Sequence, residues 1–187
     1  MSLRSRAKEW PMHNECQFSP DRKYRYFLQH RWDEPLTQRA VIFIGLNPST
    51  ADETKLDPTL RRIRGFAAAW GYNSFIMLNL FGYRTTSPKN LRQSRDPVGS
   101  DSDWWIAKSA PKADLIVAAW GSLGSYQARA EMVLTLLSSR PIYCLGTTQG
   151  GYPKHPLYVP SGAGPVPYRL RTPPLPRSYR RDWGRLC

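Results

Sequence analysis

The residues best suited to chemistry lie at the ends of apolar runs or in a glycine-rich loop. Asn47 directly follows the apolar run 40–46, and Asn79 lies near the end of the run 74–80. His155 comes after the glycine-rich stretch 146–151. An amide offers one acceptor and two donors, and imidazole can donate a hydrogen bond in either charge state. Such groups can position water, read the edge of a base and stabilise charge on a leaving group.

The elements that must position these groups alternate between strand and helix. Four apolar runs predict buried strands, at 40–46, 74–80, 113–120 and 141–145. Helical spacing predicts helices at 59–70 and 125–139, and 23–30 fits either a strand or a short helix. This order predicts one three-layer α/β/α domain around a mainly parallel four-stranded sheet. Ligands bind such sheets outside the carboxyl ends of the strands.

The domain boundaries follow changes in composition. Residues 1–22 are polar and are expected to be loose, and residues 23–160 hold the α/β domain. Residues 161–187 are rich in proline and arginine, with interleaved aromatics. That composition disfavours a packed core. Two interpretations stay open for it: a basic arm that lies on phosphates, or a solvated tail.

The charge balance points to a polyanionic partner. The 187 residues hold 27 Lys and Arg against 14 Asp and Glu, a net charge of +13. Such a field attracts nucleic acid, with an anionic membrane surface as the rival. No run approaches the roughly 20 apolar residues of a membrane span, and the N-terminus lacks a secretory apolar region, so we expect a cytoplasmic protein. Three cysteines without a CxxC pair favour neither a disulfide framework nor a metal site.

Four segments together resemble the motifs of the uracil-DNA glycosylase superfamily. Residues 45–48, Gly-Leu-Asn-Pro, are similar to the Gly-Ile-Asn-Pro-Gly turn of its mismatch-specific branch. Residues 77–79, Met-Leu-Asn, resemble a strand that ends in Leu-Leu-Asn. Residues 119–122 resemble Leu-Trp-Gly-Ser, and residues 155–157 resemble His-Pro-Ser. The segment GLNPSTAD also resembles a family of uncharacterised bacterial and phage proteins, which implies no activity.

The resemblance implies a flavodoxin-like, glycosylase-like fold and a set of roles. Asn47 would position water, Asn79 would read the flipped base, and His155 would stabilise the leaving group. Apart from the resemblance, Asp52 is a nearby carboxylate that could supply a base or stabilise the sugar cation, and so is Asp57 unless it caps the helix that opens at Pro58. The expected pocket and base contacts are Gly45, Ser49, Asn79, Phe81, Trp120 and Ser122. The expected contacts to the DNA backbone are Arg84, Ser122 and Lys154.

Plainer roles remain for several of these residues. Asn79 could tie two loops together, Phe81 could pack in the core, and His155 could be a surface side chain. Ser49 stands where the uracil-specific branch has a Tyr that blocks the pyrimidine C5 position. The smaller side chain leaves room there, so substrates are expected to include 5-substituted pyrimidines. Because such bases occur in phage DNA, a role in phage defence is conceivable.

The resulting expectation is a monomeric, monofunctional DNA N-glycosylase that leaves an abasic site. Its partner would be single- or double-stranded DNA, with no metal, cofactor, membrane or obligate protein partner. Two alternatives stay open. One is a nucleic-acid-binding module without catalysis, and the other is an enzyme on the same fold that modifies nucleotides or bases.

Overall fold

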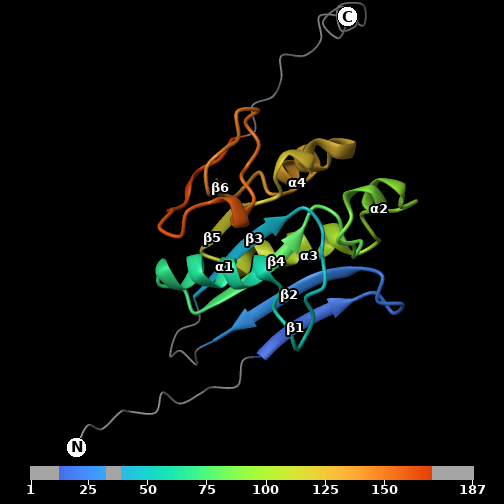
Figure 1. The fold of residues 1–187 in the computed structure, drawn as a ribbon, viewed down its shortest axis with the longest axis horizontal. Helices are drawn as coiled ribbons and strands as arrows, with labels where there is room; N and C mark the ends of the chain where they lie inside the picture. The colour runs from blue at the N-terminus through green and yellow to red at the C-terminus, as the bar shows by residue number, and fades with distance from the viewer. Residues whose placement is uncertain (1–12, 33–38, 170–187) are drawn as a thin grey trace, which may run out of the picture.

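Seven strands form one sheet in the computed structural model, which describes residues 13–32 and 39–169. The strands are β1 (His13–Phe18), β2 (Arg25–Arg31), β3 (Ala40–Gly45), β4 (Ser74–Asn79), β5 (Leu115–Ala118), β6 (Tyr143–Cys144) and β7 (Val166–Pro167). Their order across the sheet is β1-β2-β4-β3-β5-β6-β7 (Figure 1). The α-helices are α1 (Pro58–Ala69), α2 (Pro88–Gln93), α3 (Ser102–Ser109) and α4 (Arg129–Leu136). Short 3-10 helices lie at η1 (Ala110–Lys112), η2 (Ser122–Ala128) and η3 (Pro156–Tyr158).

The four strands predicted from apolar runs form the parallel centre of this sheet. β3 pairs in parallel with β4 on one side and with β5 on the other, and β5 pairs in parallel with β6. Every residue of β3 and of β4 is buried, as the continuous apolar runs predicted. The α/β class and the parallel core are therefore confirmed.

The predicted number of four strands is wrong, because three further strands extend the sheet antiparallel. β1 pairs with β2, β2 with β4, and β6 with β7, so three of the six strand pairs are antiparallel. The segment 23–30 resolves as strand β2. The two-residue β7 is too short to give a periodic signal in the sequence.

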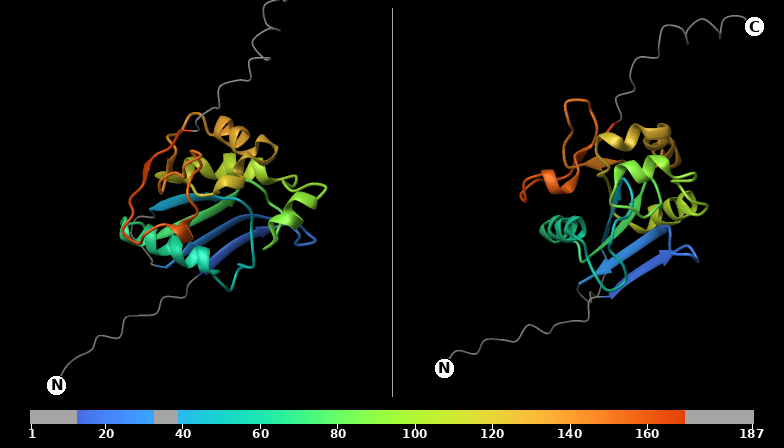
Figure 2. Two further views of the ribbon diagram at one scale, coloured as in Figure 1. Left: turned by 45° about the horizontal axis from the view of Figure 1, so that its top comes forward. Right: turned by 45° about the vertical axis from the view of Figure 1, so that its right-hand side comes forward.

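Helices cover both faces of the sheet, as the three-layer prediction required. The right-hand view of Figure 2 shows α1 on one side of the sheet, with α3 and α4 on the other. On the α1 side, Leu60 and Phe66 pack with Phe43 and Phe75. On the opposite side, α3 and α4 pack against the alternate residues of the same strands, such as Ile44 and Ile76. The sheet therefore separates two apolar cores.

Both predicted domain boundaries differ from the structure. Residues 13–18, expected to be loose, form strand β1, which pairs with β2 along its length. At the other end, β7 pairs with β6, and Tyr168 is buried against Trp120 with ring centroids 5.9 Å apart. The first part of the predicted tail thus belongs to the fold. Residues 1–12 and 170–187 lie outside the described residues.

Helix α1 agrees with its prediction and α4 is shorter than predicted. α1 has Pro58 in its first turn, as expected. The predicted helix at 125–139 instead begins at Arg129, after η2. Gln127 and Ala128 have φ of 54° and 53°, a left-handed conformation that interrupts a right-handed helix. Among the described residues, no helix combines the length and apolar character needed to cross a membrane.

The topology defines one crevice at the carboxyl ends of the parallel strands. From β3 the chain passes to β4 on one side and later to β5 on the other. The loops after β3 and β5 therefore leave the sheet in opposite directions. In open α/β sheets, this switch point is where ligands bind.

Candidate functional site

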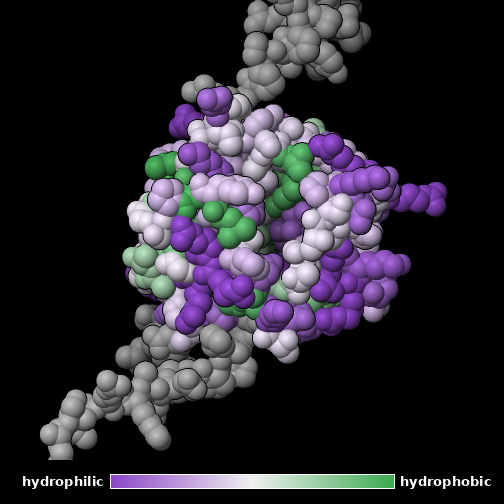
Figure 3. All heavy atoms as spheres, viewed as in Figure 1, coloured by the Kyte–Doolittle hydropathy of each residue, from purple (hydrophilic) through white to green (hydrophobic). Residues whose placement is uncertain are grey.

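A pocket of about 630 Å³ lies at this switch point. Its walls come from the segments after β3 and β5, the start of α1, and the loop that leads into η3. The face seen in Figure 3 is hollowed near its middle, with both polar and apolar atoms around the hollow. The volume falls in the usual range for small-molecule sites.

The turn after β3 forms one wall and is fixed mainly by backbone hydrogen bonds. The amides of Leu80 and Phe81 donate to the carbonyl oxygens of Gly45 and Leu46, both at 2.9 Å. The absence of a Cβ at Gly45 leaves room for the side chain of Met77, whose Cε would lie 2.4 Å from a Cβ at this position. The strand end can therefore approach β4 closely.

Asn47 both lines the pocket and holds this turn in place. Its Nδ2 donates to the carbonyl oxygen of Pro48 at 3.0 Å and to that of Thr85 at 2.7 Å. Both amide protons are thus engaged, and within the described residues no donor reaches Oδ1. The side chain therefore presents an acceptor, which can hold a water molecule but cannot act as a base.

The N-terminus of α1 brings a carboxylate to the same pocket. Asp57 is the N-cap, and its Oδ1 accepts a hydrogen bond from the amide of Leu60 at 2.9 Å. Asp57 is buried and lines the pocket. It is both the helix cap and a pocket carboxylate, two roles that the sequence presented as alternatives.

His155 faces the pocket from the opposite wall. Its Nδ1 accepts a hydrogen bond from the amide of Leu157 at 3.3 Å, so the neutral ring carries its proton on Nε2. Burial lowers the pKa of His155, while the charge of Asp57 acts in the opposite direction. The neutral ring is therefore the dominant form near pH 7, with Nε2 as a donor.

The segment after β5 completes the enclosure. Trp120 and Ser122 line the pocket, and the amide of Gly121 donates to the carbonyl oxygen of Pro153 at 3.0 Å. Gly121 has φ of 73°, a left-handed conformation that favours glycine. This bond joins the β5 end to the loop that carries Lys154 and His155, both pocket residues.

Residues 25–157 match a family model described as "Protein of unknown function (DUF1643)". The chain belongs to this family. The matched residues contain every residue of the pocket wall except Tyr158. The comparison with curated proteins and the comparison with solved structures each gave no match.

Lys154 and six other residues predicted for the site line the pocket of this DUF1643 chain. The other six are Gly45, Asn47, Ser49, Trp120, Ser122 and His155. Each sits at a strand end or in the loop before η3. The parallel strands bring these distant segments to one edge of the sheet, as the fold class predicts.

Asn79, predicted to read the base, does not line the pocket. It is 4% exposed, and a Cβ on Gly45 would lie 3.0 Å from its Oδ1. Asn79 therefore lies directly behind the pocket wall. Within the described residues neither amide atom has a hydrogen-bond partner, so the expected alternative of a loop-tying Asn is also wrong.

Two further predictions of site residues are not met. The carboxylate of Asp52 accepts hydrogen bonds from the amides of Thr54 and Lys55 and lies outside the pocket wall. Asp57 is the carboxylate that lines the pocket instead. Phe81 is fully buried in the core, which confirms its plainer interpretation. Arg84 lies outside the pocket wall, with its guanidinium 4.8 Å from the ring of Phe18, and its contact with the DNA backbone stays a prediction.

Two residues of the pocket wall, Arg25 and Tyr158, were not predicted from the sequence. Arg25 lines the pocket from β2. The residues directly around it in the sequence are aromatic or basic, without a motif for a binding site. Tyr158 is 82% exposed at the pocket and lies 5.8 Å from His155, centroid to centroid. No group of His, Cys, Asp and Glu in the described part of the chain has the arrangement to hold a metal ion.

Proposed function

We propose that this protein is a DNA glycosylase that hydrolyses the bond between an extruded pyrimidine and its sugar. The observation that carries the proposal is the shared pocket of Asn47, Asp57 and His155, three segments far apart in the sequence. The four motifs that resemble uracil-DNA glycosylases support a fold of that type. The net charge of +13 supports a nucleic acid as substrate.

The chemistry assigns one role to each wall of the pocket. Cleavage leaves negative charge on the departing base and positive character on the sugar. Nε2 of His155 donates a hydrogen bond to the base as that charge develops. Asn47 Oδ1 holds the water, and the carboxylate of Asp57 orients it or stabilises the sugar cation.

The rim of the pocket is suited to contact with a strand of DNA. Leu157 and Tyr158 are exposed on η3, beside His155. Apolar and aromatic side chains that enter a base stack help to open it, and aromatic rings stack on bases. Lys154 provides a cation at the same place. We propose that these residues hold the strand from which the base is taken.

Ser49 lines the pocket, which supports room at the pyrimidine C5 position. The preferred substrates would then include 5-substituted pyrimidines, and phage DNA is one source of them. Incubation with duplexes that hold uracil, mispaired thymine or 5-hydroxymethylcytosine, followed by detection of abasic sites, tests this. Release of uracil alone would remove the argument for bulky substituents.

The variants Asp57→Asn and His155→Gln test the mechanism. Asn preserves the helix cap while it removes the carboxylate, so Asp57→Asn should fold normally and lose at least about tenfold in rate. His155→Gln should lose about a hundredfold, because the donor to the leaving base is displaced. Base release at wild-type rate by both variants would refute the proposal. DNA binding without base release in the wild-type protein would favour the non-catalytic binding module.

A further inference from the structure

The pocket contains a buried cation without an anionic partner. Arg25 is 2% exposed and lines the pocket. Its Nη1 donates to the carbonyl oxygen of Ala51 at 2.7 Å, the one hydrogen bond that its guanidinium makes within the described residues. Its Nε is buried without an acceptor. No Asp or Glu in the described ranges lies at ion-pair distance from it.

This arrangement leaves the buried guanidinium only partly paired by protein groups. A guanidinium has five N–H donors and no acceptor, and at Arg25 the buried Nε donor has no acceptor within the described residues. Burial lowers the pKa of Arg25 to about 10, although the charge of Asp57 opposes that effect. A buried charge is normally paired. An anionic group of a ligand would provide the missing partner.

The rest of the pocket wall favours an oxyanion. Arg25 and Lys154 are two cations against the one carboxylate of Asp57, which also caps α1. Hydroxyl groups of Ser49, Thr85 and Thr86 line the same space. The guanidinium fork matches the geometry of phosphate, to which it can donate two parallel hydrogen bonds.

We propose that Arg25 binds a phosphate group of the nucleotide in the pocket, so that the ligand is recognised as a nucleotide and not as a bare base or nucleoside. This inference rests on the proposed function for the nucleotide character of the ligand. The phosphate could belong to an extruded nucleotide within a DNA strand or to a free mononucleotide. Both present the same chemistry to Arg25.

Calorimetric binding of thymidine and of thymidine 5'-monophosphate at fixed ionic strength tests the proposal. The wild-type protein should bind the monophosphate at least about tenfold more tightly, since hydrogen bonds to charged groups are the strong ones. Equal affinity for the two ligands would overturn the proposal. This comparison needs no variant, so it decides the matter even where a substitution prevents folding.

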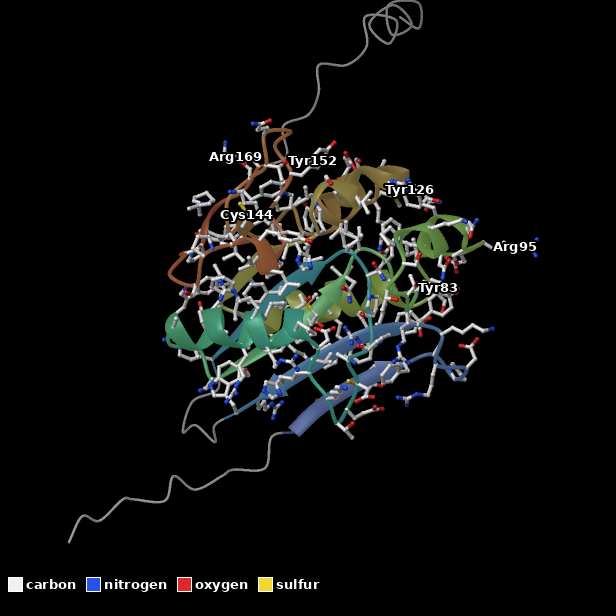
Figure 4. The ribbon with its side chains drawn as sticks, viewed as in Figure 1. Tyr83, Arg95, Tyr126, Cys144, Tyr152 and Arg169 are labelled. Atoms are coloured by element: carbon white, nitrogen blue, oxygen red, sulfur yellow. The ribbon has the colours of Figure 1, made fainter. Side chains whose placement is uncertain are left out.

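Three variants identify the residue responsible. Arg25→Met should abolish the preference for the monophosphate, and Arg25→Lys should reduce it, because a point charge lacks the fork. Arg95→Gln removes one positive charge from an exposed site and should behave as wild type. Figure 4 shows Arg95 pointing away from the molecule beyond α2. The assignment would be contradicted if Arg25→Met kept the preference for the monophosphate, or if Arg95→Gln lost that preference as fully as Arg25→Met.

Two further experiments distinguish a phosphate within a DNA strand from that of a free nucleotide, and test the anion site separately from the proposed glycosylase activity. A short single strand with a neutral methylphosphonate on the 5' side of the target should bind more weakly if the phosphate belongs to the strand. An Arg25-dependent preference for the free monophosphate alone supports the anion site with a free nucleotide as ligand. A preference for the monophosphate that depends on Arg25, without any base release, would support the anion site and refute the proposed glycosylase activity. Base release at the same rate in wild type and Arg25→Met would support the glycosylase activity and refute the anion site at Arg25.

Discussion

Asn79 shows how the surroundings of a residue can change its role. The resemblance to uracil-DNA glycosylases implies that Asn79, the last residue of β4, reads the base, but its side chain lies behind Gly45 with both amide atoms buried and unpartnered within the described residues. A buried polar group without a partner costs about 1–3 kcal/mol. The amide therefore weakens the fold unless a ligand or water reaches it.

Replacement of Asn79 by Leu tests this interpretation. The side chains are similar in size, so Asn79→Leu should stabilise the protein by about 1 kcal/mol in urea unfolding. Base release should be unchanged, because Asn79 does not line the pocket. A variant that is stable but inactive would return Asn79 to its predicted role in base recognition.

His30 is the residue that should make stability depend on pH. It is buried in β2 between the rings of Trp32 and Phe75, at 5.8 and 5.4 Å. Burial lowers its pKa from 6.5 to about 4, and Arg64 acts in the same direction. The folded state therefore favours neutral His30, and its stabilising contribution is present above pH 6.5 and lost as the pH falls towards 4.

The variant His30→Phe removes this titration. The difference between the folded and unfolded pKa corresponds to roughly 3 kcal/mol. The free energy of unfolding of the wild type should therefore fall by about that much more than that of His30→Phe between pH 7 and pH 4. The subtraction cancels the carboxylates, which titrate in both proteins. Parallel pH curves for the two proteins would rule out the assigned shift.

Among the helical elements, replacement of two glycines by alanine should change the free energy of unfolding in opposite directions. Gly124 in η2 packs under the ring of Trp120, where a Cβ would lie 2.1 Å from Cδ1. Gly65 lies inside α1, and a Cβ there meets nothing within 4 Å. Gly124 is required by its packing against Trp120 in the pocket wall. Gly65 makes no such contact and only lowers the stability of α1.

Thermal or urea unfolding of Gly124→Ala and Gly65→Ala measures the contrast. Gly124→Ala should lose about 1–3 kcal/mol, because Trp120 is buried and its rigid ring must move. Gly65→Ala should gain up to about 1 kcal/mol from helix propensity. Since Trp120 lines the pocket, only the first variant should also lose activity. Destabilisation of similar size by both variants would argue against this packing.

At the scale of the whole molecule, the excess of positive charge should govern binding to DNA. The net charge is +13 over the full sequence, and contacts to phosphates release counterions. The affinity for a short duplex should fall at least about tenfold between about 50 and 200 mM salt. Fluorescence anisotropy at several salt concentrations measures the slope. Affinity that does not depend on salt would remove nucleic acid as the expected partner.

The local features of this protein could be predicted from its amino-acid sequence. Continuous apolar runs predicted the parallel strands β3, β4, β5 and β6, because strands covered on both faces leave no polar alternation. Pro58 after Asp57 predicted the start of α1, because a cap and a first-turn proline act within one turn. The turn after β3 and the loop with His155 were predicted for the site because polar groups collect where parallel strands end.

Which of these groups line the same pocket could not be predicted from the sequence, because it depends on contacts between distant segments. The antiparallel strands β1 and β7 and the burial of Tyr168 depend on pairing with distant segments. Asp52 and Asp57 are five positions apart, yet only Asp57 lines the pocket, because the helix start turns it inward. Arg25 enters the same wall from β2, an antiparallel strand that pairs with β4. Spacing along the chain carries no information on such contacts, because long-range packing sets them.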